Sequence, residues 1–94
     1  MEYIDVQWLH ANPGDPIRLM SELDCHRYET RKLEFFSTGI VGSASGTSES
    51  ENTRLGVVPM PSLEEINADP QFRGVPIQRE LFESLWKQHA GPDA

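Results

Sequence analysis

Alternating apolar and polar positions predict a β-strand at the start of the chain. In YIDVQWLH, residues 3–10, the apolar side chains of Ile4, Val6 and Trp8 alternate with polar ones. A period of two carried by β-branched and aromatic residues is typical of a strand with one buried face. The following ANPGDP ends the strand, because prolines and glycines rarely continue a hydrogen-bonded ladder.

Three more strands are expected in the first half of the chain. IRLMSEL (residues 17–23) and RYETRKLEFF (residues 27–36) would pair through a loop at 24–26, and IVGSA (residues 40–44) would follow a tight turn ending at Gly39. Short links between consecutive strands favour an antiparallel meander.

Helical periodicity replaces strand periodicity near the C-terminus. SLEE at residues 62–65 matches a capping box, which predicts a short helix that ends at Ala68. RELFESLWKQHA, residues 79–90, is typical of an amphipathic helix. The apolar side chains on one face of this helix are Leu81, Phe82, Leu85 and Trp86. We therefore expect an α+β fold in which a four-stranded antiparallel β-meander is followed by two C-terminal helices packed on one face of the sheet.

The composition suits one globular domain that spans residues 1–94. The chain has 94 residues, of which 37% are hydrophobic and 24% charged, so it can bury one modest core. SASGTSESENT, residues 43–53, is small, polar and without periodicity, which predicts a mobile loop. Residues 91–94 are expected to form a loose tail.

The net charge of −7 disfavours one large class of partners. Affinity for nucleic acid depends largely on Lys and Arg neutralising phosphates, so we expect no nucleic-acid partner. An acidic surface suits a partner protein with a basic surface. No apolar run reaches the length of a membrane span, no signal peptide is visible, and the single Cys25 cannot form an internal disulfide, so we expect a cytoplasmic protein with no membrane contact.

The residue spacing indicates no metal site and no cofactor. Cys25 and His26 are adjacent, but neither the C-x-x-C nor the H-x-x-x-H spacing of common metal sites occurs. The glycines at 39, 42 and 46 do not lead from a strand into a helix, so no phosphate-binding loop is indicated.

The pairing of the second and third strands decides which charged side chains share a face. A loop at 24–26 would place Leu23 opposite Arg27 and Ser21 opposite Glu29. One face would then collect a contiguous apolar set: Ile17, Leu19, Leu23, Leu33 and Phe35. The other face would carry Arg18, Met20, Glu22, Tyr28, Lys32 and Glu34.

On this register, Arg27, Glu29 and Arg31 lie on the core side near the hairpin end. Buried charges must pair or reach water, so the cluster is either a rim of structural ion pairs or a binding site for a carboxylate or another oxyanion. On the opposite face, Tyr28 beside Glu22 would be either a solvated side chain or an anchor for a partner. The candidate binding residues are Glu22, Arg27, Tyr28, Glu29 and Arg31.

One alternative reading is enzymatic. His10 ends the first strand, and its convergence with Glu29 and Arg31 would supply the acid, base and phosphate clamp of a metal-independent hydrolase or nuclease. A strand-end histidine that makes a backbone hydrogen bond is the competing interpretation.

Several segments together resemble one family of small bacterial proteins. YIxVxWLH at 3–10, SELDxxRYExRK at 21–32, PSLEEINxDPxF at 61–72 and LFESLW at 81–86 are similar to the domain of unknown function labelled six-eight-eight-one. The resemblance implies a bacterial origin and a compact single domain, and it brings no activity, catalytic residue or cofactor. The sequence therefore favours a small acidic non-catalytic domain that binds another protein, for example an immunity-type inhibitor, with the hydrolase as the alternative.

Overall fold

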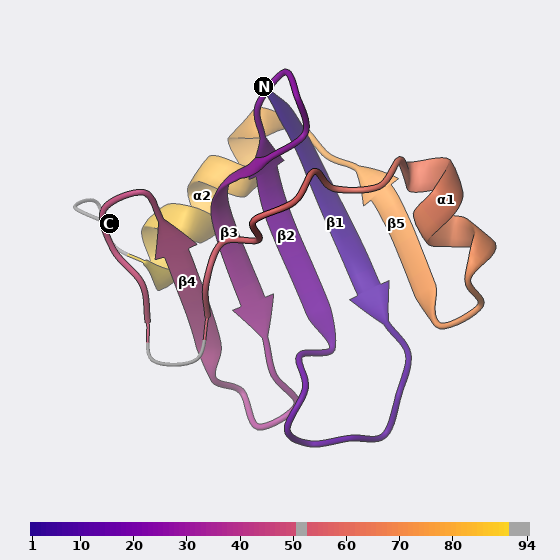
Figure 1. Ribbon diagram of the computed structural model, residues 1–94. Coiled ribbons are helices and arrows are strands. Elements are labelled where there is room, and N and C mark those ends of the chain that lie inside the picture. Colours follow the sequence, from indigo (N-terminus) through magenta and orange to yellow (C-terminus); the bar gives the residue numbers. More distant parts are fainter. Residues whose placement is uncertain (51–52, 91–94) are drawn as a thin grey trace.

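The computed structural model describes residues 1–50 and 53–90, which form an antiparallel sheet and two helices (Figure 1). The strands are β1 (Glu2–Trp8), β2 (Arg18–Leu23), β3 (Glu29–Phe35), β4 (Val41–Ser45) and β5 (Phe72–Pro76). The helices are α1 (Leu63–Ala68) and α2 (Arg79–His89). The order across the sheet is β4-β3-β2-β1-β5, and each neighbouring pair is antiparallel. The expected α+β class and antiparallel sheet are confirmed.

The sheet has five strands and not the expected four. The additional strand, β5, lies between the two helices in sequence and pairs with β1, Phe72 opposite Trp8 and Pro76 opposite Ile4. Its sequence, FRGVP, contains two residues that are depleted in strand interiors, which conceals the strand. An edge position makes both tolerable.

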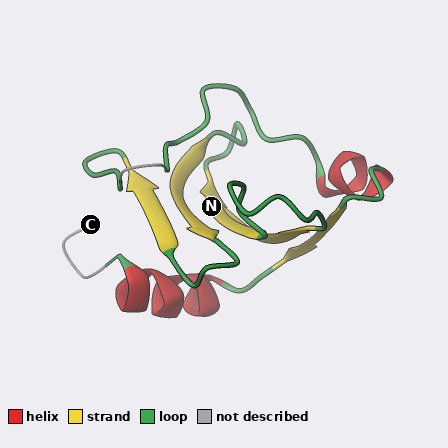
Figure 2. Ribbon diagram, turned by 90° about the horizontal axis from the view of Figure 1, so that it is seen from below, coloured by secondary structure: helices red, strands yellow, loops and turns green. Residues whose placement is uncertain are grey.

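The two helices pack on opposite faces of the sheet, so the expectation of one shared face is wrong. Tyr3 and Ile4 are consecutive on β1 and point to opposite sides. Tyr3 belongs to a core cluster with α2, whereas Ile4 belongs to a cluster with Leu63 and Ile66 of α1. Figure 2 shows α2 against one side of the sheet and the shorter α1 beside the edge on the other. We call these sides the α2 face and the α1 face.

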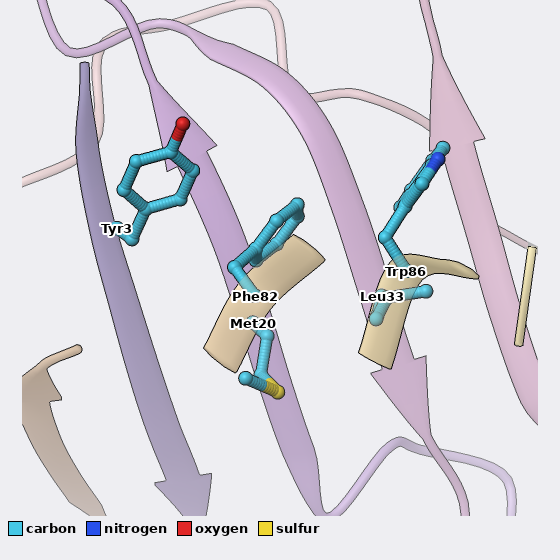
Figure 3. Packing of buried hydrophobic residues seen from close by; sticks show 5 residues of the cluster. All are labelled: Tyr3, Met20, Leu33, Phe82 and Trp86. Carbon is cyan, nitrogen blue, oxygen red and sulfur yellow. The ribbon is translucent and has the colours of Figure 1, made fainter. Parts of the chain in front are cut away.

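The α2 face carries the more completely sealed core. The buried side chains of this cluster come from three strands and α2, and they are Tyr3, Met20, Leu33, Phe82 and Trp86 (Figure 3). The rings of Phe82 and Trp86 stack with centroids 6.0 Å apart, and Tyr3 meets Phe82 at 5.3 Å. Burial of these large side chains stabilises the fold through the hydrophobic effect.

The expected register of β2 and β3 is wrong, because the turn spans residues 24–28 in place of 24–26 and a β-bulge follows it. Leu23 pairs with Glu29, Glu22 pairs with Arg31, and the register shifts between them, so Thr30 has no cross-strand partner. One extra residue reverses the side-chain parity beyond it. Met20 and Glu22, expected on the wet face, are buried, with exposed fractions of 0% and 6%.

Both edges of the sheet are covered. On β4, the segment 46–50 folds back, and the Ser43 N–H donates to Ser50 Oγ at 2.9 Å. On β5, the Asn67 side chain donates to the Gly74 carbonyl at 2.9 Å and accepts from the Gly74 N–H at 2.6 Å. Pro76, at the next outward position, has no N–H to satisfy. These contacts leave little free backbone for another strand to pair with.

The segment expected to be a mobile loop, residues 43–53, begins within β4. Residues 43–45 belong to β4, and residues 46–50 cover its edge. Residues 51–52, and the expected tail at 91–94, lie outside the described part of the chain. Within the described ranges, neither helix is long and apolar enough to cross a membrane.

Candidate functional site

The three residues of the enzymatic alternative, His10, Glu29 and Arg31, do not converge. Arg31 is level with Glu22 and Tyr3 near one end of the sheet, whereas His10 follows the other end of β1. Tyr3 and Trp8 are five positions apart along β1, which corresponds to roughly 16 Å. The His10 ring contacts the Pro16 carbonyl through Nε2 at 2.8 Å and the Asn12 N–H through Nδ1 at 2.9 Å. These local contacts match the structural interpretation of a strand-end histidine.

The expected cluster of Arg27, Glu29 and Arg31 is also divided. The bulge at Thr30 places Arg31 on the α2 face and Glu29 on the α1 face. Arg27 lies in the turn before β3. The proposed oxyanion site formed by these three side chains is therefore not assembled, and each residue makes its own set of contacts.

Arg31 forms the centre of a charged network beneath α2. Its guanidinium donates to both oxygens of Glu22, at 2.9 and 2.6 Å, and to Glu83 Oε1 of α2 at 2.7 Å. It also lies 5.1 Å from the ring centroid of Phe82 and 5.2 Å from that of Trp86. Bidentate pairing and cation–π contacts of this kind fix the helix against the sheet.

Glu22 is the most strongly perturbed carboxyl group in this network. Hydrogen bonds from Arg31, and further ones from Thr30 and Tyr3, lower the pKa of Glu22 from 4.5 to about 2 despite its burial. Burial, and the hydrogen bond to Glu22 at 2.8 Å, raise the pKa of the Tyr3 hydroxyl. The Glu22 contacts keep Arg31 charged, since they raise its pKa further. Every member of this network has a partner, so the network fits a structural role.

Glu29 and Glu34 hold a crossing segment on the α1 face. We call residues 53–61 the strap; in Figure 1 it passes in front of β3, β2 and β1 on its way to α1. Thr53 Oγ1 donates to Glu34 at 2.9 Å, and the Gly56 N–H donates to Glu29 Oε1. Glu29 also accepts from Ser21 at 3.1 Å. The strap is therefore tied to the sheet by carboxylates of β3.

Arg27 ties the far end of the strap to β1. Its side chain donates to the carbonyls of Met60 and Pro61, at 2.9 and 2.7 Å, and pairs with Glu2 at 2.7 Å. Its backbone has φ 67°, the left-handed region that a non-glycine residue enters at a cost. The guanidinium contacts hold that conformation and position Met60 and Pro61.

Tyr28 lies outside the strands and is 42% exposed. Its neighbours differ from those expected, because Met20 and Glu22 are buried under α2. Its N–H donates to the Asp24 side chain at 3.0 Å within the β2–β3 turn, which also carries the exposed Cys25.

An apolar groove opens on the α1 face between the end of the strap and α1. Val6 and Leu19, which oppose one another on β1 and β2, and Phe72 of β5 form its floor. Met60 of the strap and Ile66 of α1 form its walls. Its volume is about 390 Å³, within the range of ligand pockets.

Gly74 brings α1 against the sheet beside this groove. A Cβ at this position would lie 2.9 Å from Leu63 and 3.5 Å from Ile66. The absence of a side chain lets the two α1 residues pack on β1 and β5. The helix then forms one wall of the groove without filling it.

The rim of the groove is acidic. Glu65 and Asp69, at the first turn and the C-cap of α1, line it, and Glu64 lies on the same helix. Asp69 accepts from the Gln71 N–H, and Glu65 contacts Ser62. Among residues 1–50 and 53–90, no lysine, arginine or histidine lies within 4.0 Å of these three carboxylates. The groove thus combines an apolar floor with uncompensated negative charge.

Sequence reasoning missed this groove because its walls come from segments that carry no chemical motif. The capping box and the apolar positions of α1 were visible, but the partner strand β5 and the path of the strap were not. Within the described ranges, no three His, Cys, Asp or Glu side chains are placed to hold a metal ion.

Comparison with known proteins gives one match. The profile of a family described as Domain of unknown function (DUF6881) matches residues 2–91. Neither the curated proteins nor the solved structures contain a significant match to the chain.

Proposed function

The chain belongs to the DUF6881 family, and we propose that it is a non-catalytic domain that binds another protein through the groove on the α1 face. The observation that carries this proposal is the apolar floor under a rim of carboxylates without cationic partners. Apolar concave sites with a few polar groups at the rim are the usual form of a recognition site.

A non-catalytic role is supported by the way the charged groups are used. Arg31, Glu22 and Glu83 neutralise one another, and Lys32 pairs with Glu29 at 3.3 Å. General acid–base catalysis needs a titratable group within reach of a substrate, and these groups already contact protein atoms. The hydrolase alternative would need His10, Glu29 and Arg31 together, and they are far apart on two faces.

The net charge supports a basic partner. A chain with a charge of −7 attracts a cationic surface over several ångströms and speeds the encounter. An immunity-type inhibitor that covers the basic cleft of an enzyme is one protein class with this property. The charge on α1 would steer the encounter, and the groove would hold the bound partner.

Copurification from the native host, followed by association kinetics with the purified partner, tests the proposal. Reversing the charge on α1 with Glu64→Lys and Asp69→Lys should slow association roughly tenfold at low salt and reduce its salt dependence. Glu49→Lys and Glu80→Lys, at exposed positions away from the groove, provide the matched control. An association rate that is unchanged by the α1 reversal would reject the electrostatic proposal.

A further inference from the structure

We propose that the groove recognises an extended peptide segment that inserts one aliphatic side chain between Met60 and Ile66 and places a lysine or arginine against Glu65 and Asp69. This inference rests on the proposed function, because it states the chemistry of the partner segment that the same groove would take.

The lining of the groove selects the anchor. Val6, Leu19 and Ile66 present branched aliphatic surface, and a buried aliphatic side chain gains free energy in proportion to the apolar area it removes from water. Met60 is flexible and polarisable, so this wall can adapt to leucine, isoleucine or methionine. A volume of about 390 Å³ suits one such side chain with adjoining backbone.

The rim selects the flanking charge. Glu65 and Asp69 line the same groove and lack cationic partners in the described part of the chain. An acidic or neutral segment would leave these carboxylates uncompensated as the groove loses water. A cation beside the anchor would compensate them, and it would fit the charge of the whole chain.

The covered sheet edges favour recognition through side chains. Addition of a partner strand needs a row of free backbone groups. Gly74 already bonds to Asn67, and Ser43 bonds to Ser50. A partner therefore gains most from the groove, where apolar surface remains open.

A second copy of the chain fits less well than a basic segment. Val57 and Val58 on the strap are 89% and 67% exposed and could supply an aliphatic anchor. Two copies would each carry a charge of −7, which opposes their association. Light scattering of the free chain measures its oligomeric state and so tests for this occupant. A dimer that becomes a monomer in the Val57→Ser/Val58→Ser variant would overturn the proposal.

A peptide titration tests the inference with the full chain. The probe is a capped peptide of glycine and serine with a central Lys-Leu-Lys, and the controls are the same peptide with Lys-Ser-Lys or Glu-Leu-Glu. Amide shifts of the ¹⁵N-labelled protein should change saturably at Val6, Leu19 and Ile66, with affinity in the millimolar range. Each control peptide should bind at least about tenfold more weakly, since it lacks either the anchor or the charge.

Charge-removing variants test whether the carboxylates of the rim contribute to peptide binding. Glu65→Gln/Asp69→Asn removes two charges and retains the hydrogen-bonding atoms, and it should weaken the Lys-Leu-Lys peptide by about three- to tenfold. The matched control Glu49→Gln/Glu80→Gln should leave its affinity unchanged. Equal binding of all three peptides, shifts confined to the α2 face, or no saturable shifts would each overturn the inference. A native partner whose footprint covers the groove, although none of the peptides binds there, would leave the protein-binding proposal standing, whereas a native partner with its footprint elsewhere would overturn both.

Discussion

The two faces of the sheet both combine apolar and charged side chains, but they differ in how completely a helix covers them. On the α2 face, an eleven-residue helix lies over three strands, and Arg31 is enclosed by Glu22, Glu83 and two aromatic rings. On the α1 face, a six-residue helix sits at the sheet edge and the strap crosses the middle, so Leu19 and Phe72 stay only partly covered. Covering a face completely produces stability, and covering it incompletely leaves a place for a partner.

Charge follows the same division. Under α2, each carboxylate of the network faces a cation, and the pKa of Glu22 falls to about 2. Along α1, three carboxylates have no lysine, arginine or histidine within 4.0 Å in the described ranges. Paired charges under α2 stabilise the fold, whereas the unpaired carboxylates of α1 are available to pair with cations of a partner. Paired substitutions on the two faces test this difference.

Truncating one aromatic side chain on each face should give the largest difference. Phe82→Ala removes a fully buried ring from the α2 core and should lower the free energy of unfolding by about 3–5 kcal/mol. Phe72→Ala, at the partly exposed groove, should cost only about 1–2 kcal/mol because less buried area is lost. Urea denaturation of both variants measures the difference. Equal losses would contradict the division between a sealed and an open face.

Removing the charge of Glu22 should have the next largest effect. Glu22→Gln leaves Arg31 with Glu83 as its remaining carboxylate and should lower the free energy of unfolding by about 2–3 kcal/mol. Glu80→Gln, at an exposed position of α2, is the control. Its free energy of unfolding should stay within about 0.5 kcal/mol of that of the parent chain. Similar stabilities of the two variants would show that the network contributes little.

The same carboxyl group predicts a pH dependence. Its pKa is lower in the folded chain than in the unfolded chain, so its contribution is complete above pH 4.5 and is lost as the pH falls toward about 2. Between pH 5 and pH 3 this loss should reach about 2 kcal/mol. Chemical denaturation across this range should give a flatter profile for Glu22→Gln than for the parent chain. Parallel profiles would contradict the assignment of the titration to Glu22.

The Asn67 contact with β5 should have a smaller effect. Asn67→Ala leaves the Gly74 N–H and carbonyl without their side-chain partner and should lower the free energy of unfolding by about 1–2 kcal/mol. It also frees the outer edge of β5 for pairing between copies. Denaturation and light scattering measure the two consequences. Asn67→Asp, which keeps the acceptor for the Gly74 N–H, should be the milder change.

Removing charge from the groove rim should have the smallest effect on stability. Glu65→Gln/Asp69→Asn changes exposed groups without ion pairs and should shift the free energy of unfolding by less than about 0.5 kcal/mol. Thermal denaturation checks this value. A large loss would show that the rim stabilises the fold, which would weaken its assignment to recognition.

Periodicity predicted the first four strands and both helices. It did not predict β5 or the register of β2 and β3. The register of β2 and β3 depended on a loop length, but the bulge at Thr30 reversed the parity. Thr30 donates to the carbonyl and side chain of Glu22, at 3.1 and 2.8 Å, and these contacts exist only in the folded hairpin. Sequence alternation cannot reveal a bulge that long-range contacts stabilise.

The groove was hidden for a related reason. β5 combines Gly74 and Pro76, and each is explained only by what lies beside it: Leu63 packs against the first, and no further strand needs an N–H from the second. The candidate residues Arg27 and Glu29 do bear on the groove, though indirectly, since they hold the strap. The sequence analysis singled out both residues, but their separate contacts with the strap depend on the fold.

Hydrogen–deuterium exchange of the chain with its purified partner identifies which face of the sheet the partner covers. If the α1 face is the recognition surface, bound partner should slow exchange in residues 60–72 and 17–23 and leave α2 at its free rate. Slower exchange confined to α2 and the β2–β3 turn would contradict the account and move the binding surface to the opposite side of the sheet.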